Sequence, residues 1–246
     1  MIKEYSKTYY LSAGECNPQR ELPLSLLMNR VIDVATMHAN EWGVGYERLI
    51  ADNHAWVLAR VTVEMERYPC VNENYTLTTW IEGYNRLFSE RNMEITDVDG
   101  HTLGYVRTIW MVIDLSTRKS VDMESLTYIS ENIIDRPCPI APQGRLHPVT
   151  EGEVAEHTFG YVECDFNRHV NTVRYLELLI NQFDMSYFDN NLIHRMEMAF
   201  IKETHYGDQV KVIRHEETER DWHMAIISEE TDHIRARFQF VPRNCE

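Results

Sequence analysis

Residues 165–177 carry the side chains of this chain that are best suited to chemistry. Four polar residues occupy every second position there: Asp165, Asn167, His169 and Asn171. An apolar helical pattern follows from Val173 onward. Backbone N–H groups at a helix start lack partners within the helix and favour negative charge. A histidine and an asparagine at such a place could hold a water molecule or a carbonyl oxygen.

Three interpretations compete for this run. The first is a polar turn with a helix cap, because Asn and Asp side chains commonly bond nearby backbone groups. The second is a calcium-binding loop, which fails because Val170 stands where glycine is needed and Leu176 where glutamate is needed. The third is a catalytic loop.

Three segments, in order, are similar to one family. The run from Asp165 to Tyr175 resembles the D-x-N-x-H-V-N-N-x-x-Y loop of acyl-acyl carrier protein (acyl-ACP) thioesterases from plants and bacteria. Residues 56–69 resemble the W-V-x-A-R…Y-P strand of the family's first domain, and residues 195–204 resemble its E-Y-R-R-E-C segment. The similarity covers nearly the whole chain, and three ordered matches favour the catalytic interpretation.

The resemblance implies an α+β protein of tandem hotdog folds, in which an antiparallel sheet wraps round a long central helix. It also implies hydrolysis of acyl-ACP to free fatty acid and carrier, with the phosphopantetheine-linked acyl chain as substrate. A thioester needs a positioned water, a base and an oxyanion site. Glu203 is the expected base. The other expected site residues are Asp165, Asn167 and His169 in the loop, and Asn171 and Thr172 as the oxyanion-binding helix start.

One position departs from the family pattern. Plant members carry a cysteine directly after the glutamate, where this chain has Thr204. A Cys-His-Asn thiolate mechanism therefore cannot operate from this position. Cys164 beside the loop is a possible substitute thiol, although a small residue at a strand end is the simpler interpretation. We favour a water activated by Glu203.

The periodicity predicts two copies of one unit. In the first copy, a helix over residues 24–41 stops before Gly43 and precedes strands at 55–66, 74–82, 86–96 and 103–114. In the second copy, a helix over 172–187 precedes strands at 195–204, 209–217, 221–229 and 232–241. The predicted organisation is an N-terminal hotdog over 1–130, a Pro- and Gly-rich linker over 131–153 and a C-terminal hotdog over 154–246.

The two copies are chemically unequal. The stretch that enters the first helix, residues 17–24, has no histidine, so we expect one catalytic site per chain. In the resembling family the first domain mainly shapes the acyl pocket. Tandem hotdogs would also provide within one chain the pairing that single hotdogs obtain by dimerising, so a monomer or a homodimer is expected.

Composition restricts the function classes further. The 246 residues are 43% hydrophobic and 26% charged, which is typical of a folded globular protein. The net charge of −15 argues against nucleic acid. No cofactor or metal motif occurs, no apolar run is long enough to span a membrane, and five widely spaced cysteines suggest free thiols. Plastid members of the resembling family carry a transit peptide, whereas this chain begins almost directly at its first expected strand. A bacterial cytoplasmic protein is therefore expected. An acyl-CoA thioesterase and a non-catalytic acyl-binding hotdog protein are the alternatives.

Overall fold

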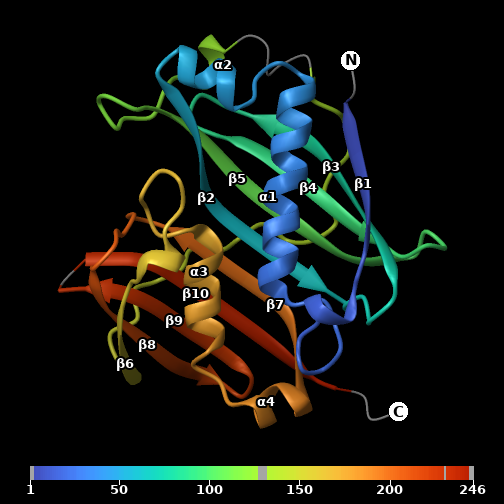
Figure 1. Ribbon diagram of the computed structural model, residues 1–246, viewed down its shortest axis with the longest axis vertical. Coiled ribbons are helices and arrows are strands. Elements are labelled where there is room, and N and C mark those ends of the chain that lie inside the picture. Colours follow the sequence, from blue (N-terminus) through green and yellow to red (C-terminus); the bar gives the residue numbers. More distant parts are fainter. Residues whose placement is uncertain (1–2, 127–131, 230, 244–246) are drawn as a thin grey trace. The chain divides into compact units, whose positions relative to one another are not determined.

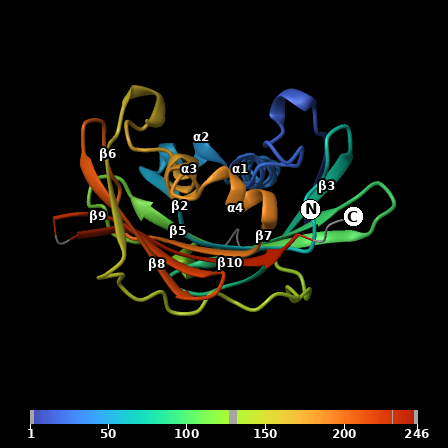
Figure 2. The ribbon, with the colours of Figure 1, turned by 90° about the horizontal axis from the view of Figure 1, so that it is seen from below.

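The chain forms two compact units, residues 1–142 and 143–246. The computed structural model describes residues 3–126, 132–229 and 231–243. Within the described residues, each unit has five antiparallel strands, with helices on the concave side of its curved sheet (Figures 1 and 2). The division between the units falls inside the predicted linker.

The N-terminal unit has the strand order β1-β3-β4-β5-β2. Its strands are β1 (Glu4–Tyr10), β2 (His54–Met65), β3 (Asn74–Tyr84), β4 (Ser89–Thr96) and β5 (Thr102–Asp114), and its helices are α1 (Leu24–Glu41) and α2 (Tyr46–Ala51). Strand β4 begins three residues later than predicted, because the Asn85 side chain accepts the N–H groups of Leu87 and Phe88 and closes a turn there.

Helix α1 lies against this sheet and has the predicted bounds. Its buried face consists of apolar residues at helical spacing, among them Leu24, Leu27, Met28, Val31, Val34 and Ala35. The helix is about 27 Å long at 1.5 Å per residue, long enough to cross the sheet. Gly43, just past its end, has φ +70°, a conformation that glycine adopts without steric cost.

A polar cluster lies inside the N-terminal unit. The Arg91 guanidinium is buried and donates to His38 Nδ1 at 2.9 Å and to Thr79 Oγ1 at 3.2 Å. Because a guanidinium can only donate, His38 Nδ1 is the acceptor and its ring proton sits on Nε2. Burial lowers the pKa of Arg91. His38 is therefore part of the core.

The C-terminal unit has the strand order β7-β10-β9-β8-β6. Its strands are β6 (Glu153–Thr158), β7 (Asn191–Phe200), β8 (Gln209–Thr218), β9 (Asp221–Ser228) and β10 (Thr231–Pro242), and its helices are α3 (Thr172–Ile180) and α4 (Met185–Asn190). Helix α3 begins at the residue predicted from the sequence, with Asn171 as its cap.

The prediction of one helix over 172–187 is wrong. Helix α3 ends at Ile180 and α4 begins at Met185, since Asp184 has the extended backbone of an N-cap. Phe183 lies between the two helices and packs on Trp222 and Phe240, with ring centroids 5.3 and 5.2 Å away. Phe183 matches the helical spacing in the sequence, but its burial in this aromatic cluster requires the chain to turn.

The predicted strand over 195–204 is shifted, because β7 leaves the sheet at Phe200. The N–H groups of Ile201 and Lys202 both donate to the carbonyl of His233, at 2.9 and 3.3 Å. The register of β10 on β9 is irregular at this point, between Asp232 and Ile234. This β-bulge ends regular pairing and directs residues 201–205 away from the sheet.

The predicted linker is partly anchored. Residues 133–152 contain no helix and, apart from an isolated bridge between Ile133 and Ile81, no strand. The first part packs on the N-terminal unit, where Trp80 donates to the Arg136 carbonyl at 2.7 Å and Arg107 donates to that of Ile140 at 2.8 Å.

Two further observations concern the whole of the described chain. None of the described helices combines the length and the apolarity that crossing a membrane would need. Four cysteines are free, and Cys245 lies outside the described residues; the free ones are Cys16, Cys70, Cys138 and Cys164.

Candidate active site

The polar loop before α3 is a tight turn built on Asp165. One carboxylate oxygen of Asp165 accepts the backbone N–H of Asn167 at 2.8 Å and that of His169 at 3.3 Å. The Asp165 N–H in turn donates to the carbonyl of His169 at 2.8 Å. Arg168 has φ +66°, which completes the reversal. Asp165 therefore sets the backbone geometry of both polar residues that follow it.

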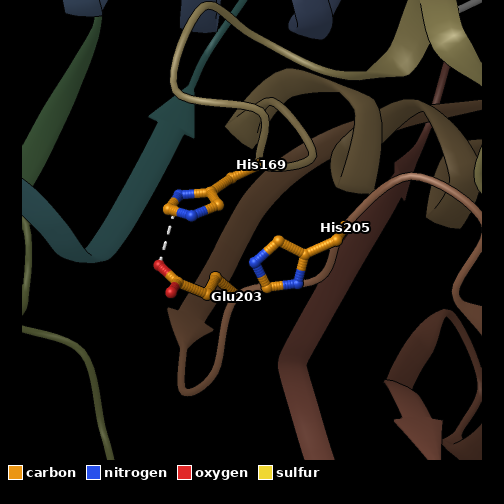
Figure 3. Close-up of side chains that lie close together, drawn as sticks. All are labelled: His169, Glu203 and His205. Carbon is orange, nitrogen blue, oxygen red and sulfur yellow. Dashed lines mark ion pairs between the residues drawn. The ribbon is translucent and has the colours of Figure 1, made fainter.

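This turn pairs with the segment that follows β7. His169 and His205 form an isolated antiparallel bridge, and the Val170 N–H donates to the carbonyl of Thr204 at 2.9 Å. Opposed residues of an antiparallel pair share a face, and so does a residue two positions along. His169, His205 and Glu203 therefore lie together on one side of this small pairing (Figure 3).

His169 and Glu203 form the central pair of the site. The His169 Nδ1 atom is 3.3 Å from a carboxylate oxygen of Glu203, and the two side chains are 27% and 38% exposed. Both are therefore held in place yet reachable by a water molecule and a substrate. The ring of His205 lies edge-on to that of His169, with centroids 4.9 Å apart. His205 had no assigned role in the sequence, because nothing local indicates this pairing.

Thr204 faces the opposite way. It is fully buried, and its Oγ1 is 2.7 Å from the hydroxyl of Tyr175 on α3. The same hydroxyl accepts the Thr204 N–H at 3.0 Å. Burial raises the pKa of Tyr175, so its proton stays available to Thr204 Oγ1. Strand-like alternation therefore turns residue 204 away from His169 whatever its side chain.

This arrangement predicts that Thr204→Val affects stability and not chemistry. The change leaves the buried Tyr175 hydroxyl with an unused proton, which costs about 1–3 kcal/mol. Urea unfolding should show the loss, while kcat of the folded variant stays close to that of the wild type. A large fall in kcat with unchanged stability would contradict this structural role.

Tyr175 thus holds the backbone on one side of Glu203, and a second contact, called a clamp here like the first, holds the backbone on the other side. His233 is buried in β10, and its Nδ1 is 3.1 Å from the carbonyl oxygen of Lys202. A carbonyl only accepts, so Nδ1 carries the proton, and Nε2 accepts from Ser228 Oγ at 2.6 Å. His233 and Tyr175 thus fix the backbone directly before and directly after Glu203. Neither clamp could be recognised in the sequence, since both depend on contacts between distant segments.

The remaining predicted residues have different outcomes. Asn167 is exposed in the turn, two residues before His169. Asn171 caps α3 by accepting the Val173 N–H at 2.9 Å, and its own N–H donates to the Glu163 carbonyl at 2.8 Å. The predicted oxyanion role therefore does not fit the backbone of Asn171, because that N–H is already used. Thr172 is the first residue of α3.

Cys164 borders the loop but its thiol is engaged elsewhere. Its Sγ donates to the carbonyl of Gly160 at 3.7 Å. We therefore expect Cys164→Ala to keep most of its activity, and no acyl group to become attached to the protein. Mass spectrometry of a quenched reaction with acyl-ACP tests this. An adduct on Cys164 that forms and decays at the catalytic rate would replace the water by a thiol nucleophile.

Comparison with protein families gives two matches that together span most of the chain. Residues 2–128 match the acyl-ACP thioesterase N-terminal domain, and residues 146–242 match the acyl-ACP thioesterase C-terminal domain.

Two curated relatives are plant proteins. A chloroplastic palmitoyl-acyl carrier protein thioesterase of Cuphea hookeriana is 23% identical over 186 residues, which are 70% of this chain and 45% of that protein. An acyl-[acyl-carrier-protein] hydrolase of Cuphea viscosissima is 21% identical over 212 residues, 81% of this chain and 52% of that one. The chain thus spans about half the length of these relatives.

Solved structures share the architecture. An acyl-ACP thioesterase from Bacteroides thetaiotaomicron superposes with a TM-score of 0.91 at 30% identity, covering 97% of this chain and 98% of that one. A 12:0-ACP thioesterase from Umbellularia californica gives a TM-score of 0.88 at 19% identity and covers 99% of both chains. The predicted tandem hotdog folds are confirmed.

Proposed function

Because the chain belongs to the acyl-ACP thioesterase family, we propose that it hydrolyses the thioester of acyl-ACP to free fatty acid and carrier. The observation that carries this proposal is the pair of His169, on the loop that resembles the family's, and Glu203, in the segment after β7, which lie 3.3 Å apart and are partly exposed to solvent. The two clamps that fix the backbone around Glu203 support it further, because a catalytic base needs a fixed position.

In the proposed reaction, Glu203 accepts a proton from water as the water oxygen bonds to the thioester carbonyl carbon. The carbonyl oxygen gains negative charge, and the carbon–sulfur bond then breaks. The leaving thiolate takes up the proton and departs as the carrier thiol. His169, whose Nδ1 lies 3.3 Å from a carboxylate oxygen of Glu203, orients that carboxylate toward the water.

The loop residues take supporting roles in this proposal. Asp165 positions the backbone of Asn167 and His169, and the Asn167 side chain orients the water or the substrate carbonyl. The start of α3 stabilises the developing oxyanion through the N–H of Thr172 and the positive end of the helix dipole. Asn171 contributes by capping that helix.

The N-terminal unit is proposed to shape the acyl pocket. The stretch before α1 is closed by hydrogen bonds between Asn17 and Glu21 and contains no histidine, so it offers no second site of the same kind.

The carrier is proposed to dock beside the loop of the C-terminal unit. Large apolar side chains that are at least 70% exposed flank the site in the sequence: Tyr161, Val162, Phe166 and Tyr206. Exposed Arg168 and Lys202 supply positive charge for an acidic carrier despite the net charge of −15.

The deciding experiment compares two carriers that bear the same acyl chain. We expect release of free thiol from acyl-ACP with a kcat/KM well above that from acyl-CoA. Equal values would favour an acyl-CoA thioesterase. Binding of acyl-ACP without any thiol release would favour a non-catalytic acyl-binding protein. The cytoplasmic location and the monomeric or homodimeric state remain predictions.

A further inference from the structure

We propose that His169, Glu203 and His205 form a binding site for a divalent transition metal, with zinc as the metal that fits best, and that occupancy stops hydrolysis. The ligand atoms of these three residues all lie within 4.8 Å of one another. All three side chains come from the same face of the loop pairing (Figure 3). The inhibition rests on the proposed function, whereas the metal binding does not.

The donor set suits zinc in kind and in spacing. Two imidazoles and one carboxylate are a known ligand set for zinc, with bonds of about 2.0–2.2 Å and an open fourth position. Tetrahedral ligands at that distance are about 3.4 Å apart. The His169 Nδ1 and Glu203 atoms already have this spacing, at 3.3 Å. Only the third ligand must approach, and the His205 side chain is 53% exposed and able to move.

His205 also has a carboxylate close to one of its ring nitrogens. Its Nδ1 is 3.7 Å from a carboxylate oxygen of Asp208, and that carboxylate accepts the N–H of His205 at 2.9 Å. A carboxylate on one ring nitrogen orients the ring and makes the other nitrogen a better ligand. We therefore assign Nε2 of His205 to the metal. Asp208 takes no part in the proposed hydrolysis.

A second group of acidic and histidine side chains provides a contrast. Asp97, Asp99 and His101 also lie close together, in the turn between β4 and β5. There, Asp97 accepts the N–H groups of Asp99 and His101 and lies 3.5 Å from Arg67. Its charge is already balanced, so a cation gains less from binding. His101→Gln is consequently a matched control for His205→Gln.

Metal binding would remove the groups that hydrolysis needs. A bound cation takes a lone pair of the Glu203 carboxylate and a ring nitrogen of His169. The carboxylate can then no longer accept a proton from water, so zinc is expected to inhibit in proportion to occupancy. A chelator should restore activity.

Calorimetric titration with zinc chloride tests the site directly. We expect a zinc-binding step in the wild type and in His101→Gln, and a Kd for that step at least about tenfold higher in His205→Gln. Magnesium should give no such step, because it prefers octahedral oxygen ligands. Thermal melting checks that the variants are folded. Identical zinc binding in all three proteins would overturn the site.

Inhibition is measured through free fatty acid, because the released thiol would itself bind zinc. The zinc concentration for half inhibition should follow the calorimetric Kd, and it should shift in His205→Gln by the same factor. Zinc that binds as expected but leaves fatty acid release unchanged would overturn the inhibition. If the metal-free protein releases no fatty acid at all, the proposed hydrolysis fails, and the calorimetry still decides the metal site.

Discussion

Glu203→Gln is expected to lower kcat by about 10²–10⁴, the usual contribution of a general base. The amide keeps the shape of the side chain and its place beside His169, but it cannot take the proton of the attacking water. The loss should appear in kcat more than in KM, because substrate binding does not use this proton transfer. Steady-state kinetics with acyl-ACP provide the measurement.

The fold should tolerate this change. Glu203 is partly exposed, and the contacts that hold its backbone come from Tyr175 and His233, which the substitution leaves intact. Glu177→Gln is a suitable control, since it removes a carboxylate of similar exposure on α3 that pairs with Arg174. Full activity in Glu203→Gln would show that another group activates the water.

Helix α1 could be predicted residue by residue because its signals are local. Apolar side chains recur at helical spacing from Leu24 onward, and Gly43 follows the last turn. The end of α3 could not be predicted in the same way. Phe183 fits the helical pattern equally well, and only its packing on Trp222 and Phe240 shows that the chain must turn before it.

In the candidate site, too, the features that depend on neighbouring residues could be predicted from the sequence, and those that depend on contacts between distant segments could not. The turn around Asp165 is encoded locally, since Asx side chains bond backbone groups two and four residues on. The meeting of His169 with Glu203 depends on where β7 ends, and that depends on the bulge at His233 in β10. The sequence alone pointed to this meeting only through the family resemblance. His205 and the two clamps required the structure.

His169→Ala is expected to lower kcat strongly while changing KM little, because His169 acts on the reacting centre and not on the acyl chain. Alanine removes the donor that orients Glu203 and opens the site to unordered water. We expect a smaller loss than for Glu203→Gln, since the base itself remains. Asn167→Ala should likewise lower kcat while changing KM little, if the exposed Asn167 side chain hydrogen-bonds the water or the substrate carbonyl.

Combining the two changes tests whether His169 and Glu203 act as one unit. If His169 works by orienting the carboxylate, it has nothing left to orient once Glu203 is replaced. The double variant His169→Ala, Glu203→Gln should then be about as slow as Glu203→Gln alone. Free energies of activation that add in full would mean that His169 acts independently, for example on the substrate carbonyl. In that case the 3.3 Å contact would be incidental to the chemistry.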